Sequence, residues 1–177
     1  MKRLLIVTAC LSIAASAFGI TLQSAYDQCG PGEGYDKLLV LNPNKVYTGG
    51  CGVLMHKKSC IRGNGALVDL DGNSIVVNQN GTELTVEGCC FIDAGYYGAI
   101  KCEDYGRIVV NGNTICKSNG LAAIYVWEGC TGIIKNNIIY GNHTYGIAKH
   151  TNTLQLDILY NDVDNNPSGN YMYYCPG

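Results

Sequence analysis

The chain is poor in charged residues and carries no excess of positive charge. Asp, Glu, Lys and Arg make up 15% of its 177 residues, and the formal net charge is −2. Such a surface has no basic field that could hold a nucleic acid or an anionic membrane. The composition therefore excludes nucleic acid from the expected partners.

Phenylalanine, tryptophan and proline are also scarce. The chain has 2 Phe, 1 Trp and 4 Pro against 13 Tyr and 23 Gly. Low charge together with many Gly, Asn and β-branched residues indicates short strands joined by tight turns, and not helices. The preference for Tyr over Phe suits a surface that stays hydrated and still makes contacts.

The apolar run near the start is too short to span a bilayer comfortably. It covers residues 4–13, follows Lys2 and Arg3, and precedes two small-x-small motifs. This order of features is typical of a signal peptide, which we place at residues 1–19. We therefore expect a secreted protein, extracellular or periplasmic, with no transmembrane anchor.

No Cys-x-x-Cys pair occurs, which argues against a zinc ribbon and against a thioredoxin-like redox site. Cysteine itself is abundant: nine of the ten residues remain after the predicted cleavage. In an exported chain this density indicates disulfides, although an odd number leaves at least one thiol over. The disulfide candidates are Cys29, Cys51, Cys60, Cys89, Cys90, Cys102, Cys116, Cys130 and Cys175.

An internal repeat is the strongest pattern present. Residues 100–115, 124–139 and 147–163 align with one another, the last with one extra residue. Each copy contains short alternating runs separated by Gly or Asn, so a single copy has one apolar face and unpaired edges. Stacking copies at ~4.8 Å pairs these edges and brings equivalent residues above one another. We therefore expect a structural ladder of Asn113, Asn137 and Asn161.

Residues 83–166 resemble the repeats of the pectate-lyase-like superfamily and of the periplasmic copper-accessory proteins of nitrous oxide reductase. In those families Gly or Ala precedes an Ile-x-Val strand, as at Gly98-Ala99-Ile100 here, and Leu22 to Gln28 is similar to their cap helix. The resemblance implies an all-β fold, a single-stranded right-handed parallel β-helix of about five to six coils. It places an N-terminal cap at residues 20–37 and the β-helix at 38–177. This repeat hosts lyases, hydrolases, epimerases, adhesins and binding scaffolds, so it does not specify a function.

Alternation along the predicted strands assigns each side chain to a face. Ile100, Cys102, Ile124 and Val126 are expected inside, with the residues between and after them outside. Two exposed aromatic rings are thereby predicted beside charged groups, an arrangement that commonly holds sugar rings. The ligand-binding candidates are Lys101, Glu103, Tyr125, Trp127 and His150. Ordinary strand-forming residues on a hydrated sheet are the alternative interpretation.

The chemistry expected of a catalytic site is largely missing. The acidic calcium ligands of pectate lyases cannot be assembled, and neither can the carboxylate motifs of hydrolases with this fold. If the protein were an enzyme, we would expect Lys101, Glu103, Arg107 and His150 to act. Of the three histidines, His56 and His150 share an outward column but lie roughly 19 Å apart at strand spacing. We therefore predict no metal site and no cofactor.

The sequence thus predicts a secreted, non-catalytic β-helix that binds carbohydrate or a cell-surface polymer through its outward aromatic face. One alternative is a small polysaccharide lyase or hydrolase. Another is a structural protein that self-associates through its C-terminal coil. Residues 171–175 are apolar and end abruptly, which leaves an open edge, and Cys175 could form an intermolecular disulfide there.

Overall fold

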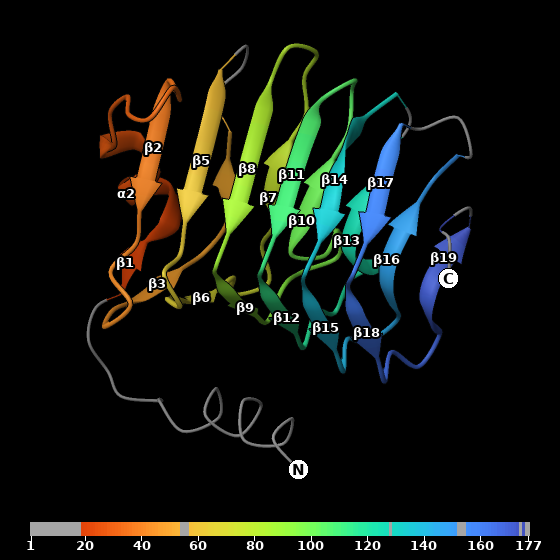
Figure 1. Cartoon of the computed structure of the whole chain (residues 1–177). Helices are drawn as coiled ribbons and strands as arrows, with labels where there is room; N and C mark the ends of the chain where they lie inside the picture. Colours follow the sequence, from red (N-terminus) through yellow and green to blue (C-terminus); the bar gives the residue numbers. More distant parts are fainter. Residues whose placement is uncertain (1–18, 54–56, 128, 152–154, 174, 176–177) are drawn as a thin grey trace.

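The computed structural model of the chain describes residues 19–53, 57–127, 129–151, 155–173 and 175. Its strands form three parallel sheets, and each coil of the chain contributes one strand to each sheet in turn (Figure 1). The chain is therefore a parallel β-helix, as the repeat predicts. The one helix described, α2 (Leu22–Gln28), lies at the N-terminal end.

We number the sheets in the order in which a coil visits them. Sheet I contains β2 (Lys37–Val40), β5 (Lys58–Arg62), β8 (Glu83–Glu87), β11 (Arg107–Asn111), β14 (Thr131–Lys135) and β17 (Leu156–Leu159). Sheet II contains β1 (Ile20–Thr21), β3 (Val46–Thr48), β6 (Leu67–Asp69), β9 (Cys90–Ile92), β12 (Thr114–Cys116), β15 (Ile138–Tyr140) and β18 (Asp162–Asp164). Sheet III contains β4 (Cys51–Gly52), β7 (Ile75–Val77), β10 (Ile100–Cys102), β13 (Ala122–Val126), β16 (Tyr145–Lys149) and β19 (Gly169–Tyr173).

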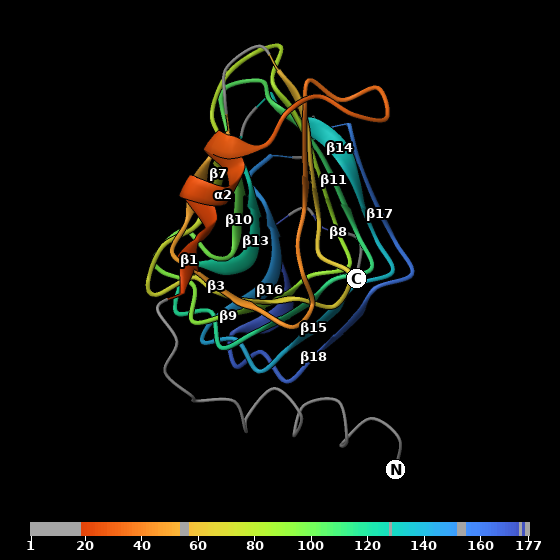
Figure 2. The same ribbon diagram turned by 90° about the vertical axis from the view of Figure 1, so that its left-hand side faces the viewer.

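The winding of the coils is right-handed. Figure 2 views the molecule from its N-terminal end, with sheet I on the right, sheet II below and sheet III on the left. The chain passes from right to bottom to left as it recedes from the viewer, which is a clockwise path. This is the hand that parallel crossover connections strongly favour.

The core fills the inside of the coil and consists of columns of equivalent apolar residues. Ile75, Ile100, Ile124 and Ile147 pair in register along sheet III, and each is 0% exposed. Burying such columns removes apolar surface from water while every strand in the interior of the stack keeps two hydrogen-bonded neighbours. The prediction that alternation places these residues inside is confirmed.

In the first coil, spacing along the sequence alone does not give the alignment. The faint copy of the repeat there would place Leu54 beside Val76, but Gly52 is the residue that pairs with Val76. Leu54 and His56 lie outside the described residues. The repeat is faint in this coil, so the pattern did not define how many residues it contains.

A short helix closes the N-terminal end of the core. The Thr21 side chain accepts a hydrogen bond from the Ser24 N–H at 3.1 Å, which caps the helix. Leu22 and Tyr26 are 0% exposed and join the core, and the Tyr26 hydroxyl lies 2.7 Å from Ser59 Oγ. The helix matches the predicted cap, and no helix in the described ranges is long and apolar enough to cross a membrane.

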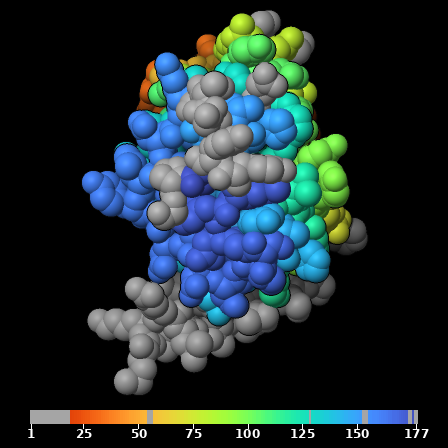
Figure 3. Space-filling view, turned by 90° about the vertical axis from the view of Figure 1, so that its right-hand side faces the viewer, coloured from red at the N-terminus to blue at the C-terminus, as the bar shows by residue number. Residues whose placement is uncertain are grey.

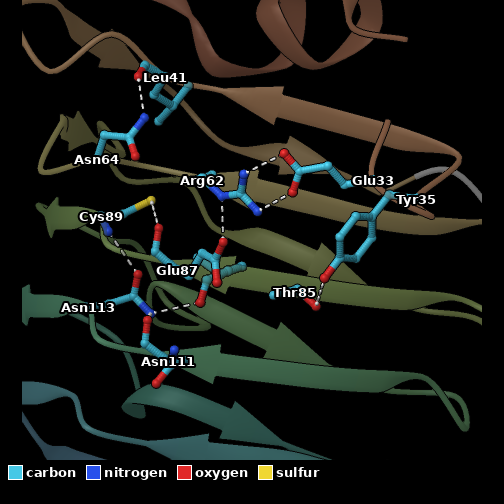
Figure 4. A network of polar contacts seen from close by, with 11 residues as sticks. Glu33, Tyr35, Leu41, Arg62, Asn64, Thr85, Glu87, Cys89, Asn111 and Asn113 are labelled. Carbon is cyan, nitrogen blue, oxygen red and sulfur yellow. Dashed lines mark hydrogen bonds and ion pairs between the residues drawn. The ribbon is translucent and has the colours of Figure 1, made fainter. Parts of the chain in front are cut away.

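Asparagine side chains connect successive coils at the corner between sheets I and II. Asn113 donates from Nδ2 to Asn137 Oδ1 at 3.1 Å, and Asn137 repeats this contact to Asn161 at 2.9 Å. The same oxygens accept the backbone N–H of the residue one coil earlier, at 2.9 and 3.0 Å. Asn113 in turn accepts the Cys89 N–H at 3.0 Å (Figure 4). The column predicted from the 24-residue spacing is therefore continuous, with Cys89 at its first step.

A second column stands at the corner that follows sheet II. The Asn142 side chain accepts the Ser118 N–H at 3.0 Å, and Asn166 accepts the Asn142 N–H at 3.0 Å. Asn119 is the nearest asparagine in the preceding coil, but it is exposed, and Ser118 occupies the buried position that is equivalent to Asn142. The spacing of the repeat is compatible with residue 118 or residue 119 at this position, so it does not show which of the two side chains faces inward.

The turn after each of the sheet I strands β8, β11, β14 and β17 holds one residue in the left-handed backbone region. Gly88, Gly112, Asn136 and Tyr160 occupy this position, with φ between 56° and 66°. Glycine and asparagine tolerate this conformation, whereas a tyrosine pays a steric cost of roughly 1–2 kcal/mol there. The stacked coils therefore impose the turn even where the residue disfavours it.

Replacing Asn137 with alanine tests the column at its middle. The substitution leaves the Asn113 N–H and the Asn113 amide without their acceptor, so we expect the free energy of unfolding to fall by roughly 2–4 kcal/mol. Asn119→Ala is the matched control, because that side chain is exposed, and it should change stability by less than about 0.5 kcal/mol. Urea titration followed by circular dichroism measures both. Equal effects of the two substitutions would contradict the account.

Candidate functional site on the outer face of sheet III

The predicted ligand-binding residues lie on the outer face of β10, β13 and β16. Lys101, Tyr125 and Ala148 pair in register, one per coil. Trp127 N–H donates to Cys102 O at 2.7 Å and His150 N–H donates to Val126 O at 3.0 Å. These bonds extend the pairing beyond the strands, so that Glu103, Trp127 and His150 follow one another in the neighbouring column.

Tyr125 points outward as predicted, but the prediction that its ring is exposed is wrong. The side chain is only 3% exposed and forms a small apolar cluster with Ala122 and Ala148. The two alanines let the ring lie close to the sheet, while Leu121, Tyr145 and Met172 pack around it. Alternation assigns a side chain to a face, but it does not show what covers that face.

Trp127 retains an exposed indole, at 37% of its surface. The His150 ring stacks on it, with centroids 3.8 Å apart and planes at 23°. Tyr125 contacts it edge-on at 5.4 Å and 64°. Such contacts fix the orientation of the indole.

Lys101 and Glu103 form an ion pair beside these rings. Lys101 Nζ lies 2.6 Å from a Glu103 carboxylate oxygen and 3.8 Å from the centroid of the Tyr97 ring. Lys101 is 9% exposed, so the expected exposed cation is in fact largely covered. Its charge is compensated by the carboxylate and by the face of the aromatic ring.

The structure adds two tyrosines that the sequence argument missed. Tyr96 and Tyr97 lie in the turn before β10, are 65% and 45% exposed, and contact each other edge-on at 5.1 Å. The adjacent pair between Gly95 and Gly98 was visible in the sequence, but strand alternation says nothing about a turn. From here on, "aromatic strip" denotes the connected outer residues Tyr96, Tyr97, Lys101, Glu103, Tyr125, Trp127 and His150.

The four residues proposed for catalysis do not form one group: Lys101, Glu103 and His150 lie on sheet III, whereas Arg107 does not. Arg107 begins β11 of sheet I, and its Nε lies 3.3 Å from Glu83, which also binds Lys58 at 3.6 Å. Lys101 is engaged by Glu103 and His150 by Trp127. In the described part of the chain, no three His, Cys, Asp or Glu side chains gather in a group that could hold a metal ion.

Another charged cluster, on sheet I, serves to attach the N-terminal segment. Arg62 binds both oxygens of Glu33 at 3.0 and 2.8 Å and donates from Nε to Glu87 at 2.6 Å (Figure 4). The guanidinium lowers the pKa of Glu33 below its usual value, through its hydrogen bond and its charge. Tyr35, in the same segment, reaches Thr85 at 3.4 Å. The charges of Arg62, Glu33 and Glu87 therefore compensate one another.

The cysteines are mainly core residues. No disulfide joins any of the described cysteines, Cys29 to Cys175, so the predicted disulfide framework is not present in this structure. Burial raises the pKa of the Cys51 thiol to about 12 and that of the Cys60 thiol to about 11. Cys89 faces the core and Cys90 is half-buried, which agrees with opposite faces for adjacent strand residues.

The comparisons with known proteins give no relative. No protein family, no curated protein and no solved structure matches the chain. The resemblance to pectate-lyase-like and copper-accessory β-helices therefore stays a prediction beyond the fold itself.

Removing the imidazole that stacks on Trp127 should change tryptophan fluorescence. The chain has 1 Trp, so the emission reports this position alone. His150→Ala exposes one face of the indole to water, and we expect the emission to shift to longer wavelength. His143→Ala, at an exposed position outside the aromatic strip, is the control and should leave the spectrum unchanged. An unshifted His150→Ala spectrum would mean that the two rings do not stack in solution.

Proposed function

We propose that this protein binds carbohydrate through the aromatic strip and does not catalyse a reaction. The observation that supports this most is the arrangement of the strip. Ring and charge contacts join Tyr96, Tyr97, Lys101 and Glu103 in one coil and Tyr125, Trp127 and His150 in the next two, and strand pairing places Lys101 beside Tyr125. Partly exposed rings held rigidly on a sheet lose little conformational entropy when a flat apolar sugar face packs on them. Export of the protein, inferred from the predicted signal peptide, is part of this proposal.

The charges in the strip favour an uncharged glycan over a polyuronate. The Lys101 ammonium already binds Glu103 and the Tyr97 ring, so recruiting it to a uronate would break an existing ion pair. Asn78 extends the outer column of Glu103 by one coil, since Glu103 N–H donates to Val77 O at 2.8 Å, and it is exposed. Its amide can both donate to and accept from sugar hydroxyls.

The geometry gives less support to a polysaccharide lyase or hydrolase. A lyase needs a base that is available to remove a proton, and a hydrolase needs two carboxyl groups facing the scissile bond. Lys101 and Glu103 neutralise each other, and Arg107 binds Glu83 on another sheet. Two of the residues that the sequence offered for catalysis are thus engaged with each other, and Arg107 is engaged on a different sheet.

Substitution of the exposed rings tests the binding proposal. We expect Trp127→Ala and Tyr97→Ala each to weaken retention on a neutral polysaccharide by about ten-fold, a loss of about 1.4 kcal/mol. Tyr140→Ala is the matched control, because Tyr140 is also 37% exposed but lies on sheet II. A glycan array identifies the polysaccharide, and affinity electrophoresis measures the retention. Binding to a neutral glycan that survives both strip substitutions, or no binding to any glycan, would overturn the proposal.

A specific observation also favours self-association through the C-terminal coil. In the described part of the chain, β17, β18 and β19 each have a strand partner on one side only, whereas α2 covers the core at the opposite end. Figure 3 views this end, where residues of the last coil lie at the surface. Unpaired strand edges favour pairing with another chain. A second copy meeting this edge would continue the sheets.

Sedimentation velocity at increasing protein concentration tests this second proposal. We expect a concentration-dependent dimer, because the open edges of β17, β18 and β19 can pair with a second copy. Cys175→Ser separates covalent from non-covalent association, since it removes only a disulfide between copies. A monomer at all concentrations, with and without reductant, would contradict the proposal.

A further inference from the structure

Two cysteines face each other inside the corner where sheet III passes into sheet I. Cys102 ends β10, Cys130 immediately precedes β14, and both side chains are 0% exposed. Two backbone bonds hold their segments one above the other: Trp127 N–H to Cys102 O at 2.7 Å, and Thr131 N–H to Gly106 O at 3.0 Å. The two residues therefore belong to successive coils and share one corner of the core.

The thiols contact each other directly. The Cys102 S–H donates a hydrogen bond to the Cys130 sulfur, which also accepts from the backbone N–H groups of Tyr105 and Gly106. A Cβ at Gly106 would lie 3.2 Å from Cys102 Sγ, so the glycine leaves room for the sulfur atoms in the turn. These donors lower the pKa of Cys130, whereas the hydrogen bond to Cys130 and burial raise the pKa of Cys102.

We infer that Cys102 and Cys130 are the reduced form of an intrachain disulfide, which forms when the chain folds in the presence of a low-molecular-weight disulfide. Either cysteine thiolate can start the reaction before the corner has packed; where Cys130 does so, it attacks the oxidant, for example oxidised glutathione, and forms a mixed disulfide with release of one glutathione thiolate. Cys102, after losing its proton, attacks the Cys130 sulfur and releases the second glutathione. The two cysteine sulfurs are oxidised, the oxidant is reduced to two thiols, and the two cysteine protons end on them.

The burial of the pair decides when this reaction occurs. Neither sulfur is accessible in the closed coil, so the oxidant reaches Cys130 before this corner has packed. Once formed, the bond is shielded from external thiols and resists reduction. It also ties two coils together directly behind the segment that carries Lys101, Glu103 and Trp127. The inference does not depend on the proposed function, because it concerns the inner side of that segment.

Refolding under defined redox conditions tests this inference. The reduced, unfolded full chain is refolded with a mixture of reduced and oxidised glutathione, remaining thiols are alkylated under denaturing conditions, and tryptic and chymotryptic peptides are mapped by mass spectrometry. We expect a cross-linked peptide containing Cys102 and Cys130, about 2 Da lighter than the sum of the reduced peptides because two hydrogens are lost. The linked protein should unfold at a higher urea concentration than the reduced protein.

Two variants provide the control. Cys102→Ser should abolish the cross-link and leave Cys130 open to alkylation after unfolding, whereas Cys51→Ser, at another buried position, should leave the cross-link intact. The wild-type map is decisive even if a variant fails to fold. Refolded native chain in which Cys102 and Cys130 are both alkylated, or are joined to other cysteines, would overturn the inference.

Discussion

A buried asparagine amide that bonds to the coils on both sides is the contact on which this structure depends. Asn137 Oδ1 accepts the backbone N–H and the side-chain amide of Asn113 from the preceding coil, and Asn137 Nδ2 donates to Asn161 in the following coil. The backbone N–H groups of Cys89, Asn113 and Asn137 donate to these side chains, so without them the three groups would lose their acceptors at the corner. Asn137 and Asn142 thus fix the register as well as the stability of the stack, because a shift of one residue would separate the amides from their partners.

The register in turn determines what the outer face can present. Because Lys101 pairs with Tyr125 and Tyr125 with Ala148, one coil supplies a charge, the next a ring and the third a small residue that the ring can cover. The aromatic strip is therefore a product of the stacking and not of any one segment. Its rings are fixed by neighbours in other coils, as the stacking of His150 on Trp127 shows.

Most of the fold could be predicted because equivalent residues recur at a nearly constant spacing, and this spacing shows how successive coils align with one another. Spacing placed Asn113 and Asn137 in one column, and alternation assigned Ile124 to the core. The outer site was predictable only in part, because the coverage of Tyr125 depends on side chains from three coils and the position of Tyr97 on a turn. Spacing also left open which of two adjacent residues faces inward, as Ser118 shows. Pattern rules describe neighbours along a strand, whereas exposure depends on neighbours across strands and turns.

Hydrogen exchange of individual backbone amides tests the central role of the asparagine columns most directly. The amides of Cys89, Asn113 and Asn137 lie in turns but donate to buried side-chain oxygens. They should exchange as slowly as the amides of the central strands, such as that of Val110 in β11, when measured by NMR on the native protein. Exchange at the rate of an unstructured peptide, while the strand amides remain protected, would contradict the account.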